Sequence, residues 1–109
     1  MSATLAERIL ARAAGVDRVR PGDEVWCRAD RMVMNDSSGP RRFGPLLDSL
    51  GGLRDPSRVV VVSDHFTPAA SERHAEILAT TRSWAAANGV RWFSEGDGIL
   101  HDLILEQRL

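Results

Sequence analysis

Three polar clusters in the sequence are candidates for chemistry, and each follows a segment that is typical of a β-strand. They are Asn35-Asp36, Asp64-His65 and the stretch 96–101, which ends in His101. In open α/β sheets, ligands bind beyond the carboxyl ends of the strands, so side chains that follow different strands can converge on one crevice. The three clusters therefore indicate part of the wall of an active site.

Asp64 and His65 are the strongest candidates for acid–base chemistry. They directly follow a run of four valines. A carboxylate near an imidazole can fix its tautomer and raise its basicity, which suits a general acid or base near neutral pH. Adjacent side chains on an extended backbone point apart, so the sequence does not guarantee their contact. The alternative is a turn aspartate beside a surface histidine, and the position at a strand end favours the functional interpretation.

The other two clusters also have structural interpretations. Gly96 and Gly98 would let the backbone approach a ligand closely before His101, but a flexible turn explains them as well. Asn and Asp are among the commonest turn residues, so the pair Asn35-Asp36 is more readily structural when taken alone. His74 falls within a predicted helix, where a structural or surface role is expected.

The elements that must position these residues follow from periodicity and turn signals. Helices are predicted over 4–14, 43–50 and 68–88, strands over 58–63 and 90–93, and a strand or a pair of short strands over 24–34. Thr4 with Glu7 forms a capping box, and Thr67-Pro68 is typical of a helix start. Residues 99–105 fit a helix or an extended arm. The alternation predicts an α/β fold, a three-layer α/β/α arrangement with a largely parallel sheet.

Composition excludes several classes of protein. The 109 residues, 43% of them hydrophobic, fit one compact domain. The net charge is −1 and the arginines are spread along the chain, so no nucleic-acid partner is expected. There is no signal-peptide pattern and no apolar run near the ~20 residues of a membrane span, so a cytoplasmic protein without a membrane partner is expected.

Cys27 is the only cysteine in the chain. A single thiol excludes an internal disulfide, and it also excludes an iron–sulfur cluster held by several thiolates of this chain. We predict that Cys27 is a small buried hydrophobe on a strand over 25–29. No metal ligands are predicted within the chain.

Taken together and in register, the motifs resemble a known family. The segments 30–36, 62–68 and 96–101, supported by 4–12 and 20–23, are similar in order and spacing to the N-terminal part of the aconitase superfamily. The likeness is greatest to the large subunits of 3-isopropylmalate dehydratase and homoaconitase. It covers essentially the whole chain, and three motifs in register are more specific than any one.

The resemblance implies a hydro-lyase that dehydrates and rehydrates a hydroxy di- or tricarboxylate with a four-iron four-sulfur (4Fe-4S) cluster. It implies that Asn35 contacts the substrate and that Asp64 and His65 assist departure or addition of the substrate hydroxyl. His101 would lie close to the substrate and to cluster-bound water. Leu100 and Asp102 beside this histidine depart modestly from the family pattern.

The family's cluster cysteines, substrate-binding arginines and serine base lie in parts that these motifs do not cover. We therefore expect residues 1–109 to be an incomplete, N-terminal segment of a larger aconitase-type α/β/α domain, a fragment or one piece of a split enzyme that binds no cluster alone. The implied partners are the remainder of the large subunit, a small swivelling subunit or domain, and a small hydroxy-acid substrate.

Two other functions remain open. The first is a non-catalytic binding or assembly module that retains the fold. The second, a stand-alone hydrolase that uses Asp64 and His65, is disfavoured because the chain has no recognisable nucleophile elbow. The sequence does not select among isopropylmalate, homocitrate and other malate-like substrates.

Overall fold

The computed structural model describes residues 3–109, which form two compact units. The first unit ends at Asp30, and the second spans Arg31–Leu109. A single compact domain was predicted, so the division is a difference from the expectation. Residues 21–30, at the end of the first unit, are exposed throughout. Each unit is described by itself below.

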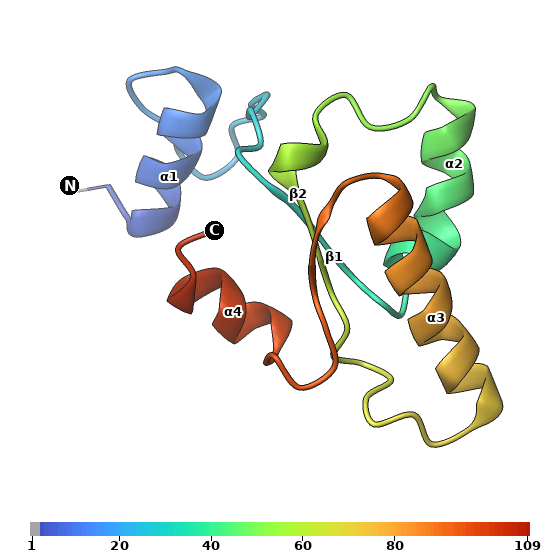
Figure 1. Ribbon diagram of the computed structural model, residues 1–109. Helices are drawn as coiled ribbons and strands as arrows, with labels where there is room; N and C mark the ends of the chain where they lie inside the picture. Colours follow the sequence, from blue (N-terminus) through green and yellow to red (C-terminus); the bar gives the residue numbers. More distant parts are fainter. Residues whose placement is uncertain (1–2) are drawn as a thin grey trace. The chain divides into compact units, whose positions relative to one another are not determined.

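The N-terminal unit is built on helix α1, Leu5–Ala14 (Figure 1). The predicted capping box is confirmed, because the Thr4 hydroxyl accepts from the Glu7 N–H while the Glu7 carboxylate accepts from the Thr4 N–H, at 3.2 and 2.6 Å. Gly15 ends the helix in the left-handed conformation, with φ of 69°. The backbone N–H of Arg28 then donates to the carbonyl of Ala13, which fixes the returning segment to the helix end.

The strand predicted over 24–34 forms only at its end, as β1, Met32–Asn35. A strand needs a neighbour to accept its backbone hydrogen bonds, and in this segment only these four residues pair with the next strand, β2, Val59–Val62. The prediction that Cys27 lies buried on a strand is therefore wrong, because Cys27 is exposed and outside any strand. Trp26 is 98% exposed.

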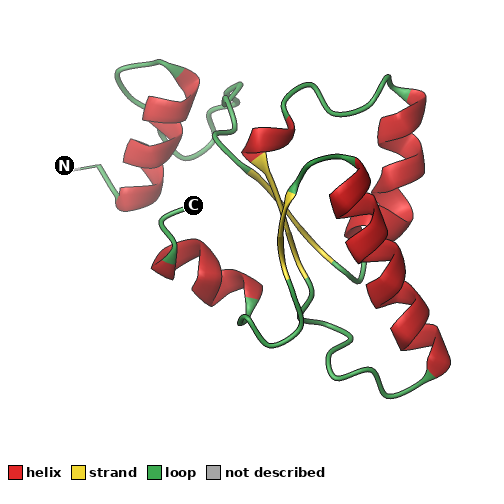
Figure 2. Ribbon diagram, viewed as in Figure 1, coloured by secondary structure: helices red, strands yellow, loops and turns green. Residues whose placement is uncertain are grey.

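The second unit contains a three-stranded parallel sheet in the order β1-β2-β3 (Figure 2). The central strand β2, Val59–Val62, is the run of four valines, and all four are buried. Strand β3 is Arg91–Phe93. Because β2 is covered on both faces and both edges, only β-branched apolar residues occur in it, as the sequence predicted.

Helices cover both faces of this sheet. A π-helical turn, Gly39–Phe43, leads into α2, Gly44–Ser49, and a 3₁₀ turn, Pro56–Arg58, leads into β2. Helix α3, Glu72–Ala87, connects β2 to β3, and α4, Leu100–Glu106, follows β3. Figure 1 shows α2 and α3 on one side of the sheet and α4 on the other.

Alternate valines of β2 point into two separate cores. Val59 and Val61 pack with Met34, Leu47 and Trp84 under α2 and α3. Val60 and Val62 pack on the opposite face with the buried leucines of α4. The predicted three-layer α/β/α arrangement with a parallel sheet is confirmed for this unit, and residues 100–106 are a helix rather than an extended arm.

Helix α3 begins later than predicted. Thr67-Pro68 does not start it, because the N-cap is Ser71, whose hydroxyl accepts from the backbone N–H of His74 at 3.2 Å. The segment 67–70 has no regular structure. Among the described residues, no helix is both long and apolar enough to cross a membrane.

Candidate active site at the strand ends

The buried carboxylate of Asp36 joins the carboxyl ends of β1 and β2. Asp36 follows β1 directly and is 0% exposed. Its two oxygens accept from the backbone N–H groups of His65 and Phe66, each at 3.1 Å. Its own N–H donates to the carbonyl of Val62. Asp36 therefore fixes the backbone at His65 from a position 29 residues earlier in the chain.

Asp64 and His65 are in direct contact. His65 Nδ1 lies 2.6 Å from Asp64 Oδ1 and 3.7 Å from Asp36 Oδ1. The contact between neighbours is possible because the chain bends at residues 65–66 instead of remaining extended. A carboxylate at Nδ1 favours the tautomer that carries its proton there, so Nε2 is left to exchange protons. The imidazole is 46% exposed, whereas the Asp64 side chain is 8% exposed.

The second oxygen of Asp64 connects this pair to the third predicted cluster. Asp64 Oδ2 accepts from the backbone N–H of Leu100 at 2.8 Å, at the start of α4. His101 is the next residue and is exposed, and its side chain makes no hydrogen bond within residues 3–109. Asp64 thus bonds to the imidazole on one side and holds the residue before His101 on the other.

Asn35 lies at the same edge of the sheet, opposite Val62 in the β1–β2 register. Its Oδ1 accepts from the hydroxyls of Ser37 and Ser38 and from the Ser38 N–H, at 2.8, 3.2 and 3.1 Å. These bonds order the loop after β1, as the turn interpretation predicted. The side-chain amide nitrogen makes no hydrogen bond within the described residues, so it remains available as a donor.

The glycines before His101 have structural reasons for their positions. Asp97 accepts from the N–H and hydroxyl of Ser94 and thereby closes the turn after β3. Gly98 has a φ of 144°, and a Cβ there would lie 3.2 Å from the Leu103 side chain. Close packing against α4 thus accounts for Gly98, while Gly96 has a positive φ of 97° in the turn.

His74 is a structural histidine, as predicted. It lies in α3, its ring packs on Phe66 at 4.8 Å between centroids, and its Nδ1 accepts from the Ala70 N–H. The residues Asn35, Asp36, Asp64, His65 and His101 are called the strand-end cluster below. His74 is the one histidine of the sequence outside this cluster, and it serves as a comparison for His65 and His101.

Asp36, Asp64 and His65 also form the one group of three potential metal ligands found among residues 3–109, with ligand atoms within 4.8 Å of one another. All four carboxylate oxygens already accept hydrogen bonds from this chain. The arrangement is therefore complete as a hydrogen-bonded acid–base site.

The contribution of Asp36 was missed in the selection of site residues, although the pair Asn35-Asp36 was recognised as a cluster. Its role depends on the register that pairs Asn35 with Val62, which places Asp36 beside the bend after β2. Two predicted parallel strands that end in polar residues are the only sequence signal for it.

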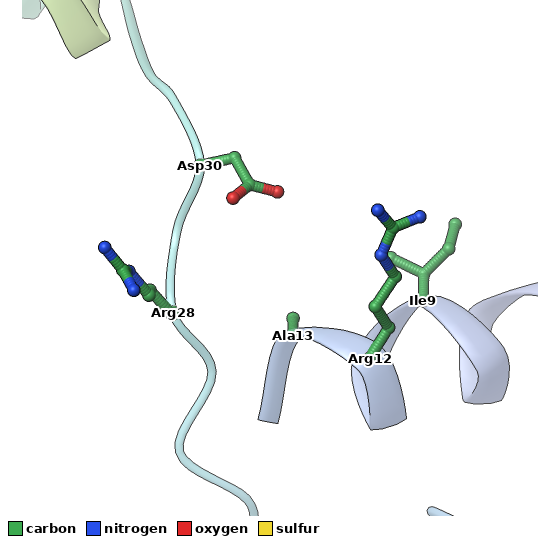
Figure 3. A pocket seen from close by; sticks show the side chains of 5 residues that line it. All are labelled: Ile9, Arg12, Ala13, Arg28 and Asp30. Atoms are coloured by element: carbon green, nitrogen blue, oxygen red, sulfur yellow. The ribbon is translucent and has the colours of Figure 1, made fainter. Parts of the chain in front are cut away.

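Two hollows of the surface do not involve the predicted site residues. One of about 360 Å³ in the N-terminal unit is lined by Ile9, Arg12, Ala13, Arg28 and Asp30 (Figure 3). A second, of about 250 Å³, lies between β1 and α2 and is almost wholly apolar. None of the predicted site residues lines either hollow.

The fold and the cluster define the class of protein: an α/β sheet with a carboxylate–imidazole pair at the carboxyl ends of its strands, where such sheets bind ligands. No family model matches the chain. Curated proteins do match it over nearly its whole length.

The chain is 40% identical to the 3-isopropylmalate dehydratase large subunit 2 of Rubrobacter xylanophilus, over 97% of the chain and 26% of that protein. It is 39% identical to the 3-isopropylmalate dehydratase large subunit of Herpetosiphon aurantiacus, over 100% of the chain and 27% of that protein. It is 35% identical to the homoaconitase large subunit of Thermus thermophilus, over 100% of the chain and 26% of that protein.

The chain is therefore homologous to the N-terminal part of 3-isopropylmalate dehydratase and homoaconitase large subunits, and the resemblance predicted from its motifs is confirmed. The chain spans about a quarter of the length of the curated relatives it matches.

Proposed function

We propose that this chain supplies acid–base residues to the active site of a hydro-lyase, which dehydrates and rehydrates a hydroxy di- or tricarboxylate of the malate type. The site is incomplete by itself and works with the remainder of a large subunit and with a small subunit or domain. Residues 1–109 act as the N-terminal segment of an aconitase-type domain, in a cytoplasmic enzyme. The relatives named above supply the reaction class.

The observation that carries the proposal is the arrangement around Asp64. One oxygen holds His65 Nδ1 at 2.6 Å and the other holds the Leu100 N–H at 2.8 Å. Removal of a hydroxyl from a hydroxy acid requires that a proton be delivered to the leaving oxygen. A positioned imidazole whose other nitrogen makes no hydrogen bond within residues 3–109 can deliver it.

In the dehydration direction, protonated His65 donates from Nε2 to the substrate hydroxyl, the carbon–oxygen bond breaks, and water leaves. In hydration, neutral His65 accepts a proton at Nε2 from the attacking water. Asp64 keeps the ring oriented through both directions. A base outside this site removes the proton from the neighbouring carbon. Asn35 contributes a hydrogen bond from its amide nitrogen to the substrate, and His101 contacts the substrate from the start of α4.

A four-iron four-sulfur cluster does not fit the residues of this chain. The sequence contains one cysteine, Cys27, and it lies in the N-terminal unit outside the strand-end cluster. Such clusters are held by several thiolates. We propose that the cluster of the complete enzyme is bound by its other parts, so the roles assigned above concern only protons and hydrogen bonds of this chain.

A chimeric enzyme tests the proposal. This chain replaces the matched segment of the Rubrobacter xylanophilus large subunit, and the chimera is assayed with its small subunit for 3-isopropylmalate dehydration. We expect turnover, and we expect His65→Ala or His101→Ala to lower kcat by about 100-fold or more, the scale of a lost acid–base group. His74→Ala is the matched control and should retain turnover.

Turnover of the His65→Ala chimera at the unsubstituted rate would remove His65 from the reaction. A second measurement does not depend on the chimera: L-malate is titrated into the free chain while its histidine ring signals are followed by NMR. The signals of His65 and His101 should move and that of His74 should not. If none moves and the chimera is inactive, the assembly-module alternative is correct instead.

A further inference from the structure

Arg41 lies at the same edge of the sheet as the acid–base pair. It is the third residue of the helical turn Gly39–Phe43, which directly follows the loop after β1. Side chains on a helix tilt toward its N-terminus, so Arg41 is directed back toward that loop. Its Nη2 donates to the carbonyl of Ser37 at 3.0 Å. The guanidinium is thus fixed to the loop that Asn35 orders through Ser37 and Ser38.

The charge of Arg41 has no partner among the described residues. No carboxylate within residues 3–109 forms an ion pair with it, in contrast to Arg82, which pairs with Glu95 at 3.3 Å. Its Nε is buried and has no acceptor. A half-buried cation with an unpaired donor costs folding free energy unless a partner compensates it. The single hydrogen bond to the Ser37 carbonyl compensates only a small part of that free energy.

The surroundings of the site require a cation if the ligand is an anion. The strand-end cluster contains two carboxylates, Asp36 and Asp64, which would repel a carboxylate ligand. Neither forms an ion pair with Arg41. A guanidinium that is held in one orientation by its own backbone contact is well suited to bind a carboxylate with its remaining N–H groups.

We propose that Arg41 binds a carboxylate group of the hydroxy-acid ligand and so sets its orientation relative to His65. This role rests on the proposed function and adds a substrate-binding residue to it. A purely structural role, in which Arg41 only holds the Ser37 carbonyl, makes different predictions and is the outcome against which the proposal is tested.

The chimeric enzyme separates binding from chemistry. Arg41→Gln should raise KM for 3-isopropylmalate about 10-fold or more with kcat within about 3-fold, because a charge-assisted contact to a non-reacting group is lost. Arg41→Lys should give an intermediate KM, since it keeps the charge but not the planar donors. Arg42→Gln is the matched control, because Arg42 is the next residue and is exposed. The KM of this variant for 3-isopropylmalate should stay unchanged.

An unchanged KM in Arg41→Gln, while His65→Ala abolishes turnover, would overturn this inference and leave the proposed function intact. So would equal effects of Arg41→Gln and Arg42→Gln, which would mean a general effect of charge. If Arg41→Gln and Arg41→Lys lower the melting temperature equally and change KM equally, the structural role is correct.

A measurement on the free chain keeps the inference testable if the chimera does not assemble. The Nε–H of Arg41 is buried and should give a slowly exchanging NMR signal. L-malate should shift it, and the neutral dimethyl ester of malate should not. If malate moves the His65 signal but not that of Arg41, this inference is wrong; if it moves neither and the chimera is inactive, the proposed function fails as well.

Discussion

Asp36→Asn tests whether one buried carboxylate holds the active-site backbone in place. The substitution keeps the size of the side chain and changes only the hydrogen bonds that the side chain can make. The carboxylate receives two backbone N–H groups, from His65 and Phe66, at 3.1 Å each. An amide can accept only one of them through its oxygen, and its NH₂ group then faces the other N–H as a second donor.

The expected cost follows from these two bonds. A hydrogen bond to a charged acceptor contributes about 1.5–3 kcal/mol, and an unsatisfied buried donor costs about 1–3 kcal/mol. Because one hydrogen bond is lost and the other no longer has a charged acceptor, we expect the free energy of unfolding to fall by about 2–4 kcal/mol. That is a large part of the total of about 5–15 kcal/mol that is usual for a domain.

Urea denaturation followed by circular dichroism measures this change. With a slope of about 1.5 kcal/mol/M, the midpoint should fall by about 1.3–2.7 M. Asp48→Asn makes the same chemical change at an exposed position of α2 and should shift stability by less than about 0.5 kcal/mol. In NMR spectra, the amide signals of His65 and Phe66 should move in Asp36→Asn, whereas those of α1 should not.

A midpoint for Asp36→Asn equal to that of Asp48→Asn would refute the reasoning, because it would mean that the two backbone bonds carry no net free energy. Unchanged amide signals at 65 and 66 would refute it independently of stability. Loss of stability without any change at His65 would show that Asp36 supports the fold but does not position the site.

Two further predictions concern the core and the first helix. Val61→Ala, at a fully buried position of β2, should cost about 1.5–3 kcal/mol in urea denaturation, against less than about 0.5 kcal/mol for Val16→Ala at a 45% exposed position. The pKa of Glu7 is lowered chiefly by the backbone N–H of Thr4 that its carboxylate accepts. The capping box therefore stabilises α1 above the unfolded pKa of Glu7 and loses this effect as pH falls through the lowered value. In an NMR titration, the signals of the Glu7 carboxyl and of the Gly15 amide should change over the same pH range. In Glu7→Gln, the pH-dependent change of the Gly15 signal should disappear.

Much of the fold was predictable because local signals and tertiary packing agree. Four consecutive valines have few alternatives to a strand covered on both faces, and Val59–Val62 is that strand. The capping box at Thr4 and the glycine at position 15 defined α1 nearly to the residue. Polar residues after each strand identified the edge of the sheet where the site lies.

The errors have tertiary causes. Apolar residues over 25–29 favour a strand, but a strand forms only where β2 offers a partner, and that begins at Met32. Thr67-Pro68 has the chemistry of a helix start, but Ser71 offers a hydroxyl to the N–H of His74 and begins α3 there. Local propensity could not decide where the strand β1 and the helix α3 begin.

The site was predicted in part for the same reason. Asp64 and His65 were identified from their position after β2, but their contact depends on a bend that no local pattern specifies. The role of Asp36 depends on strand register, which pairs residues 29 positions apart. Arg41 gave no signal in the sequence, because its missing partner is visible only once the neighbours of its side chain are known.

The order of the strands in the sheet, β1-β2-β3, is also their order along the chain. No strand has to be inserted between two others, so each strand that leaves the ribosome can pair with the one made just before it. Synthesis delivers the N-terminal elements first. Asp36 is therefore already present, at the end of β1, when the backbone of His65 emerges. The acid–base pair can thus be fixed in place during translation, one strand at a time.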